Sequence, residues 1–300
     1  MRGIIIRSQS GFFTVQTENG QWVCQLRGKL KHGRQPIDLA AVGDWVDLTI
    51  LDHEKGIIEM VEPRQRVFSR LAPNPHGEYQ QVLIANPDQV VMVFACAQPE
   101  PKVGMLDRFL VMAERQGIPA KIVVNKIDLM DLEDVQSMFG FYNDLGYPVI
   151  YTSVKDEWGI ETLREVLSQK VSLLTGPSGV GKSSLLNAMQ PGLGLEVSKI
   201  SQATNKGRHT TVVRELFALE GGGYVADTPG LKALALWDIE PEELDGYFPE
   251  LRSLVDQCQF SDCTHVHEPG CAVLQALSAD EIIASRYHSY LRMRFGDQAE

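Results

Sequence analysis

A glycine-rich segment in the second half of the chain has the residue types and spacing of a phosphate-binding loop. Residues 176–183, Gly-Pro-Ser-Gly-Val-Gly-Lys-Ser, match the pattern G-x-x-x-x-G-K-S. Glycines let backbone N–H groups approach a triphosphate closely, the lysine reaches the β- and γ-phosphates, and the serine hydroxyl binds Mg²⁺. An apolar run precedes the loop and a helix-forming run follows it, so the phosphates would face a helix N-terminus. The predicted nucleotide contacts are Gly176, Ser178, Gly179, Val180, Gly181, Lys182, Ser183 and Ser184.

A second motif could read the base of the nucleotide. Residues 125–128, Asn-Lys-Ile-Asp, follow the apolar run 120–124, which is typical of a parallel strand buried on both faces. The Asp128 carboxylate can accept hydrogen bonds from guanine N1–H and the 2-amino group, and adenine offers neither donor. We expect Asn125 to reach the other edge of the base and Lys126 to pack over the ring. Ser153 lies in a segment, 151–154, that resembles the loop closing over the base in GTPases.

The order of these two motifs along the chain is inverted. In most GTPases the N-K-x-D element lies downstream of the phosphate loop, whereas here it comes first. The sequence therefore indicates a small class, the circularly permuted GTPases.

Two further segments have the residues of γ-phosphate sensors. Asp227-Thr-Pro-Gly230 follows a strand-like run, so Asp227 would hold Mg²⁺ through water and the Gly230 amide would contact the γ-phosphate. Thr210 and Thr211 lie between this element and the phosphate loop, and either threonine could supply a hydroxyl and a carbonyl at the metal.

The residue after the D-x-x-G element affects the expected rate of hydrolysis. Leu231 stands where many GTPases carry a glutamine that orients the attacking water, and an apolar side chain cannot do this. We therefore expect slow intrinsic turnover. His209, beside the two threonines, is the candidate for the missing catalytic group. Its alternatives are a phosphate or RNA contact and an ordinary surface histidine.

A cysteine and histidine cluster near the C-terminus indicates a structural zinc site. Cys258, Cys263, His265 and Cys271 have the spacing C-x4-C-x-H-x5-C, which supplies the four N and S ligands that tetrahedral Zn²⁺ requires. His267 is an alternative to His265. Disulfides are the competing interpretation, but the short N-terminal apolar run is not a secretory signal, and a cytoplasmic chain would keep its thiols reduced.

Hydrophobic periodicity predicts three regions. Residues 1–65 contain five short strand-like runs, which suggest a small closed, OB-like β-barrel. Residues 66–237 alternate strands and helices, as in a doubly wound α/β sheet, with a linker beginning at Pro63. Residues 238–300 predict helical runs at 241–247 and 278–294 around the zinc cluster.

Charge is unevenly distributed along the chain. The whole chain has a net charge of −11, and residues 236–300 carry four basic against thirteen acidic side chains. The N-terminal region is balanced and has a basic cluster at residues 27–34, where a small barrel would bind RNA. No apolar run approaches a membrane span, and Cys24 and Cys96 lie in apolar runs as expected of buried core thiols.

Taken together, these motifs resemble the ribosome small-subunit-dependent GTPase A family, circularly permuted GTPases of bacterial 30S biogenesis. Residues 176–184, 207–211, 263–265 and 268–271 carry the resemblance, which covers essentially the whole chain. It implies GTP hydrolysis stimulated by the small ribosomal subunit, with the barrel and zinc module docking on 16S rRNA. It also implies that His209 is the catalytic histidine. We expect a cytoplasmic monomer that uses GTP with Mg²⁺ and one structural Zn²⁺.

Two other functional classes are compatible with parts of the pattern. A non-catalytic GTP-binding scaffold on another RNA or partner is compatible with Leu231, and it would bind GTP without turnover. A nucleotide kinase resembling guanylate kinase shares the Gly-Pro-Ser-Gly-x-Gly-Lys-Ser loop. That loop would normally open a kinase domain, and the kinase leaves residues 125–128 and 227–230 without a purpose.

Overall fold

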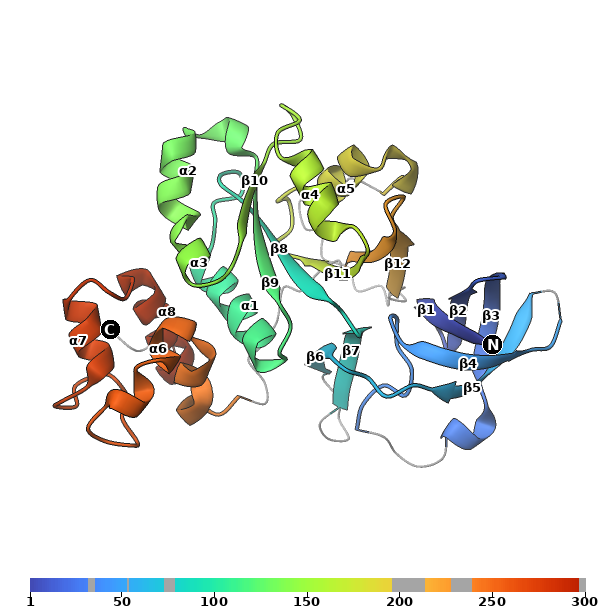
Figure 1. Cartoon of the computed structure of the whole chain (residues 1–300), viewed down its shortest axis with the longest axis horizontal. Helices are drawn as coiled ribbons and strands as arrows, with labels where there is room; N and C mark the ends of the chain where they lie inside the picture. Colours follow the sequence, from blue (N-terminus) through green and yellow to red (C-terminus); the bar gives the residue numbers. More distant parts are fainter. Residues whose placement is uncertain (32–35, 53, 73–78, 196–213, 228–238, 297–300) are drawn as a thin grey trace, which may run out of the picture.

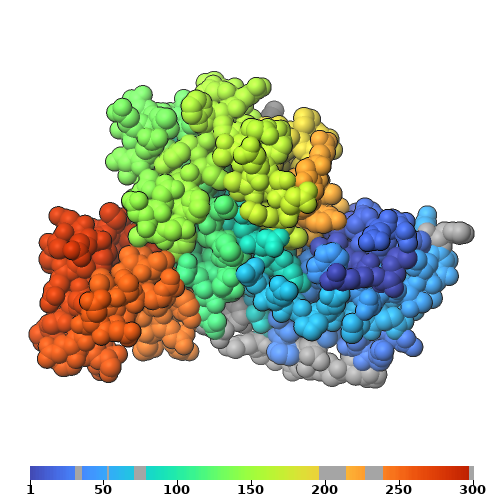
Figure 2. All heavy atoms as spheres, in the orientation of Figure 1, coloured from blue at the N-terminus to red at the C-terminus, as the bar shows by residue number. Residues whose placement is uncertain are grey.

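The computed structural model describes the chain except for residues 32–35, 53, 73–78, 196–213, 228–238 and 297–300. Three regions follow one another along its long axis. The N-terminal barrel and the C-terminal helical module lie at opposite ends, and the α/β region lies between them (Figures 1 and 2). This arrangement confirms the fold class expected from the sequence.

The N-terminal region is a closed five-stranded barrel. Its strands are β1 (Arg2–Gln9), β2 (Phe12–Thr17), β3 (Gly20–Leu26), β4 (Trp45–Ile50) and β5 (Lys55–Val61). β1 pairs with both β2 and β4, and the parallel β3–β5 pair completes the ring in the order β1-β2-β3-β5-β4. Alternate residues such as Ile5, Val15 and Ile58 are fully buried inside the barrel, in a hydrophobic core that continues into one face of the central sheet.

The central region is a parallel sheet with one antiparallel edge. Its strand order is β10 (Val149–Thr152), β9 (Ala120–Asn125), β8 (Gln89–Ala95), β11 (Lys170–Thr175), β13 (Gly223–Asp227) and β12 (Arg214–Ala218). Only β12 runs antiparallel to its neighbour. All seven residues of β8 are buried, because helices cover both faces of the strand.

The residues of β8 alternate between two hydrophobic cores. Val90, Met92 and Phe94 pack against α1 (Val103–Arg115), α2 (Leu132–Phe139) and α3 (Phe141–Asp144). Val91 and Val93 pack against α4 (Ile160–Leu167) and α5 (Lys182–Met189) on the opposite face. The sheet is therefore doubly wound, and its carboxyl-terminal edge is where a ligand site is expected.

The connection between barrel and sheet differs from the predicted linker. Residues after Pro63 form an antiparallel hairpin, β6 (Val67–Ala72) and β7 (Tyr79–Ala85), which the sequence analysis missed. β12, also missed, pairs with β1 of the barrel and joins the two regions into one eleven-stranded sheet. The division at residue 65 remains a proposal, because hydrogen bonds between strands run continuously from barrel to sheet.

The C-terminal module is built from short helices. They are the 3₁₀ helix η4 (Pro241–Tyr247), α6 (Pro249–Arg252), the 3₁₀ helix η5 (Val255–Gln257), α7 (Ala272–Ser278) and α8 (Ala284–Phe295). The predicted continuous helical run over 278–294 is wrong. α7 ends at Ser278, and Asp280 in the following turn has a φ of +58°, so the helix cannot continue to Ala284.

A buried ion cluster joins this module to the central region. Arg286 on α8 pairs with Asp107 on α1 at 2.6 Å and with Glu250 on α6 at 2.7 Å. Tyr142 on α3 donates to the same Asp107 carboxylate at 2.7 Å. The Arg286 and Asp107 side chains are fully buried, which fixes α8 against the sheet-covering helices. Within the described part of the chain, no helix is long and apolar enough to cross a membrane.

Candidate nucleotide and metal sites

The glycine-rich loop follows β11 at the carboxyl end of the sheet and leads into α5. Gly176 has a φ of +144°, and a Cβ there would lie 2.0 Å from the carbonyl oxygen of Val93. Gly181 has a φ of +97°, and its Cβ would lie 2.4 Å from Nδ2 of Asn125. Both positions therefore require glycine, for backbone conformation and for space.

Lys182 curves back over this loop. Its Nζ donates hydrogen bonds to the carbonyl oxygens of Gly176 and Pro177, each at 2.9 Å. The ammonium group therefore lies at the mouth of the loop, beside the first turn of α5. Ser183 and Ser184 occupy that turn and are half-buried. A cation and the N–H groups of a helix start thus converge on one place, the arrangement that binds phosphate.

Asn125 connects the base-reading motif to the phosphate loop. Its Nδ2 donates to the carbonyl oxygen of Val180 at 2.8 Å, and its Oδ1 accepts from Oγ1 of Thr152 at 3.1 Å. The side chain is only 2% exposed. These contacts leave one N–H of the amide and one lone pair of its oxygen, so the expected contact of Asn125 with the other edge of the base stays a prediction.

Lys126 makes a second connection of the same kind. It has a φ of +64°, and its Nζ donates to the carbonyl oxygen of Gly179 at 2.7 Å. Its own carbonyl accepts from Sγ of Cys96 at 3.0 Å, so this cysteine, buried as predicted, also supports the turn. The two motifs therefore belong to one site, although they lie about fifty residues apart in the chain.

Asp128 is held ready to accept hydrogen bonds. Oγ of the fully buried Ser153 donates to its Oδ1 at 2.8 Å, and Nζ of Lys155 lies 3.7 Å from Oδ2. The sequence analysis missed Lys155 and Thr152. The signal that could have found them is their position beside Ser153, in the loop expected to close over the base.

The remaining predicted catalytic residues cannot be placed. His209, Thr210, Thr211, Gly230 and Leu231 lie outside the described residues. Asp227 ends β13, where its backbone is in register with Leu174 of β11, one residue before the strand end that leads into the phosphate loop. Its backbone position fits a residue near the bound metal.

Four side chains of the C-terminal module converge as metal ligands would. The ligand atoms of Cys258, Cys263, His265 and Cys271 all lie within 4.8 Å of one another. Nδ1 of His265 is 3.4 Å from Sγ of Cys271 and 3.6 Å from Sγ of Cys258. Tetrahedral zinc with bonds of about 2.0–2.3 Å places its ligands roughly 3.5–3.8 Å apart. The donor set and its spacing therefore fit a structural zinc ion.

Surrounding groups orient the histidine of this cluster. Nε2 of His265 lies 3.0 Å from Oδ2 of Asp245, which leaves Nδ1 for a metal. The hydroxyl of Tyr287 donates to the backbone carbonyl of His265 at 2.7 Å. The His265 side chain is fully buried. His267 is exposed and lies outside the cluster.

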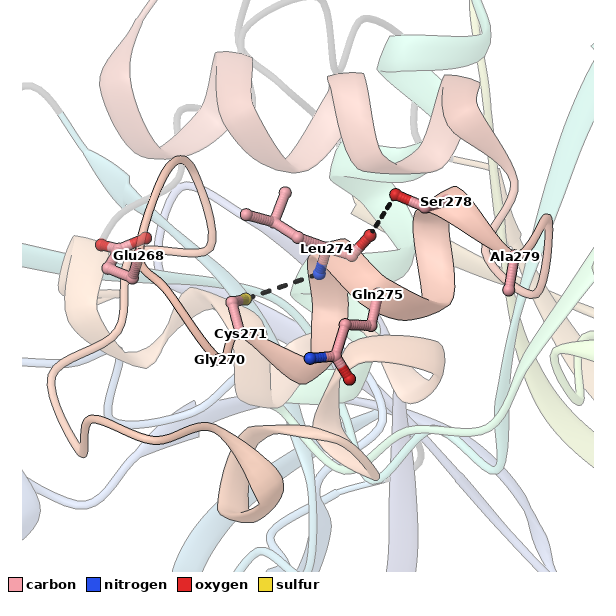
Figure 3. Close-up of a pocket in the computed structure, with 7 residues that line it drawn as sticks. All are labelled: Glu268, Gly270, Cys271, Leu274, Gln275, Ser278 and Ala279. Carbon is pink, nitrogen blue, oxygen red and sulfur yellow. Dashed lines mark hydrogen bonds between the residues drawn. The ribbon is translucent and has the colours of Figure 1, made fainter.

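Two further contacts order the backbone on either side of the cluster. Cys271 is the N-terminal cap of α7, since its Sγ accepts from the backbone N–H of Leu274 at 3.5 Å (Figure 3). Glu268 accepts from the backbone N–H groups of Thr264, Val266 and His267. Burial opposes its negative charge, but hydrogen bonds from Thr264 and these backbone groups outweigh burial and lower its pKa below the usual range. The turn between the ligands is therefore held by protein contacts.

The order and position of the two nucleotide motifs define a class of protein. The N-K-x-D motif, which begins at the end of β9, precedes the phosphate loop that follows β11. Side-chain hydrogen bonds join the two motifs into one site on a doubly wound sheet. This is a circularly permuted GTPase.

Comparison with known families identifies the group within that class. Residues 61–237 match the model of the RsgA GTPase, and residues 2–58 match the RsgA N-terminal domain. The chain belongs to the RsgA family and is a GTP hydrolase. Family membership decides against the non-catalytic scaffold and against the nucleotide kinase.

Individual relatives match over nearly their full length. The small ribosomal subunit biogenesis GTPase RsgA of Gemmatimonas aurantiaca is 44% identical over 97% of this chain and 96% of its own. The crystal structure of YjeQ from Thermotoga maritima is 39% identical and superposes with a TM-score of 0.79, covering 100% of this chain and 99% of that one. The structure of YloQ, a circularly permuted GTPase, is 33% identical with a TM-score of 0.75, covering 100% and 96%.

Proposed function

We propose that this GTPase hydrolyses GTP to GDP and phosphate under stimulation by the small ribosomal subunit. It would act as a late assembly factor of the 30S subunit, which it binds through 16S rRNA. The printed names of its relatives, small ribosomal subunit biogenesis GTPases at 36–44% identity, support the choice of partner. The resemblance of residues 207–211 and 263–271 to the family's motifs supports it independently.

One observation carries the choice of nucleotide. Asn125 and Lys126 donate directly to carbonyls of the phosphate loop, while Asp128 remains beside them as an acceptor. Hydrogen bonds therefore link the motif that would recognise the base to the loop that would bind the phosphates. A guanine seated on Asp128 would fix the register of the triphosphate on Gly176–Ser183.

The catalytic roles follow from the chemistry of the side chains. Lys182 would neutralise charge on the β- and γ-phosphates, and the Ser183 hydroxyl would ligate Mg²⁺, with Asp227 holding the same ion through water. Thr210 or Thr211 and the Gly230 amide would sense the γ-phosphate. His209 would orient the attacking water, because Leu231 cannot.

Two regions would dock on RNA, each for a different reason. The barrel has balanced charge and a basic segment around Arg27 and Lys29, where an RNA backbone would bind, whereas the C-terminal module is acidic and would dock through the surface around its candidate zinc cluster. We propose a cytoplasmic monomer with functional regions 1–65, 66–237 and 238–300. Because the permutation places residues 227–230 directly before the C-terminal module, loss of the γ-phosphate would alter how that module docks.

Sedimentation with purified ribosomal subunits tests this function. The chain, loaded with a non-hydrolysable GTP analogue, should pellet with small subunits and stay in the supernatant with large subunits. Loading with GDP should reduce the pelleted fraction severalfold. Equal recovery with both subunits, or with neither, would contradict the proposed partner, and equal recovery in both nucleotide states would contradict the coupling.

A further inference from the structure

A hollow of about 290 Å³ lies where the three regions of the chain meet. Its walls come from the start of hairpin β6–β7, from the C-terminal end of α1, and from Ile239 at the start of the C-terminal module. α1 runs from the carboxyl end of β8 back to the amino end of β9, so its last turn lies at the sheet edge opposite the phosphate loop. The polar residues that line the hollow are Arg64, Gln65, Arg66, Ser69, Gln80, Arg115 and Gln116.

Arg64 is fixed at the wall of this hollow. Its Nε and Nη2 donate to the two carboxylate oxygens of Asp44 at 2.8 and 2.7 Å, and Nη2 also donates to the carbonyl of Asp38 at 2.8 Å. Its side chain is only 13% exposed. Within the described part of the chain, Nη1 has no hydrogen-bond partner, so two oriented N–H donors of the guanidinium remain available.

Ser69 and Gln116 are oriented across the same hollow. The backbone N–H of Ser69 donates to Oε1 of Gln116 at 3.0 Å, and Nε2 of Gln80 donates to Oγ of Ser69 at 2.7 Å. The bond from Ser69 uses only the oxygen of the Gln116 amide, so the N–H groups of that amide remain as donors, and the Gln80 bond holds Ser69 in place. Ser69 is 1% exposed, so its position is set by packing as well.

We infer that this hollow is a second phosphate-binding site, separate from the nucleotide loop. Among the described residues that line it, none is acidic, although acidic side chains outnumber basic ones in the whole chain, 39 to 28. Guanidinium groups and side-chain amides are donors that bind phosphate oxygens in proteins. A phosphate held there would contact the hairpin and α1 beside the start of the C-terminal module, and so stiffen the joint between regions.

The phosphate could belong to a free anion or to an RNA backbone, because both offer the same oxygen acceptors. Two probes distinguish these sources. Pyrophosphate represents the free anion, and a short single-stranded RNA with a 5′-hydroxyl offers only backbone diesters. Protein saturated with GDP and Mg²⁺ keeps both probes out of the nucleotide loop, and chloride keeps the ionic strength equal.

Two variants and a matched control test the assignment by calorimetric titration. Gln116→Glu keeps the acceptor for the Ser69 N–H but replaces the donor amide with a negative charge. Arg66→Gln/Arg115→Gln removes two charges from the hollow, and Arg70→Gln/Arg108→Gln removes two from the same elements outside it. Each test variant should weaken binding at least tenfold, because it removes charged or hydrogen-bonding donors from the hollow, whereas the control should bind like the unmodified chain.

The probe whose binding falls identifies the source of the phosphate. A loss confined to pyrophosphate assigns the site to a free anion, and a loss in RNA binding assigns it to an RNA backbone. Equal affinities in test and control variants would overturn the proposal, as would failure of the unmodified chain to bind either probe.

Discussion

At the scale of single residues, we propose that Asp128 decides which base the nucleotide site accepts. Its carboxylate is 90% covered, and Ser153 and Lys155 hold it without exhausting its lone pairs. Asp128→Asn exchanges acceptors for an amide, so GTP affinity should fall at least about 100-fold, while xanthosine triphosphate, which has a carbonyl at position 2, should gain relative to GTP. Competition binding measures both. Asp156→Asn in the neighbouring loop is the control, and equal losses in the two variants would remove base recognition from Asp128.

We propose that His209 acts on the rate of GTP hydrolysis and not on the affinity for GTP. His209→Ala should leave GTP binding unchanged but remove most of the turnover stimulated by small subunits, since positioned water-orienting groups contribute roughly 10²–10⁴-fold. Binding titrations measure the GTP affinity, and phosphate-release assays with and without small subunits measure the turnover. His288→Ala, an exposed histidine on α8, should behave like the unmodified chain. Stimulated turnover that survives in His209→Ala would assign the water-orienting role to another group.

Residue chemistry was predictable from the sequence where a motif combines rare residue types with fixed spacing. Gly176 and Gly181 were predicted to be positions where only glycine lets the backbone approach closely. The structure shows the backbone and side-chain atoms that a Cβ would meet there. The contact of Asn125 with the phosphate loop was not predictable. A motif gives the type of a side chain, whereas its hydrogen bond to Val180 depends on how β9 and β11 lie in the sheet.

At the scale of elements, the candidate zinc cluster lies within the hydrophobic core of the C-terminal module. Cys263 and Cys271 belong to the same buried cluster as Phe248, Leu251 and Tyr290, so a zinc ion there would cross-link that core and add to its stability. His265→Ala should lower bound zinc well below one ion per chain and broaden the thermal unfolding of the module. Elemental analysis and calorimetry measure these effects. His267→Ala, exposed and outside the cluster, should retain the metal, and a zinc loss there instead would make His267 the ligand.

Elements were predicted well where hydrophobic periodicity dominates and poorly where tertiary contacts decide. The five barrel strands, β9, and the strand and helix that flank the phosphate loop fall close to the expected runs. Hairpin β6–β7 was missed because the polar segment after Pro63 indicates a loop until its pairing partner is known. The break between α7 and α8 was missed because no glycine or proline marks it, and the chain turns at Asp280 instead.

At the scale of the whole molecule, the buried Arg286 cluster fastens the C-terminal module to the nucleotide-binding region. Arg286→Ala would leave Asp107 and Glu250 buried without their partner, at a cost of about 3–5 kcal/mol. Arg252→Ala breaks an exposed ion pair between α6 and Glu114 of α1, and should cost less than about 1 kcal/mol. Urea unfolding of the zinc-loaded variants measures both, and similar losses would show that the buried cluster does not fasten the module.

The permuted order of the motifs explains why the contact between the C-terminal module and α1 is important. The sheet assembles from the same strands wherever the chain is opened, but the opening decides which segment follows residues 227–230. Here it is the C-terminal module, attached through Arg286 to the helix that follows β8. Domain order was readable from motif order, whereas the β1–β12 pairing that joins barrel and sheet required the structure.

Steady-state GTP hydrolysis by the purified chain, alone and with isolated small ribosomal subunits, tests the central claim most directly. We predict slow turnover alone, because Leu231 cannot orient water, and an increase of at least tenfold with small subunits but not with large subunits. GTP binding without any increase in turnover on small subunits would contradict the claim that the ribosomal subunit completes this active site.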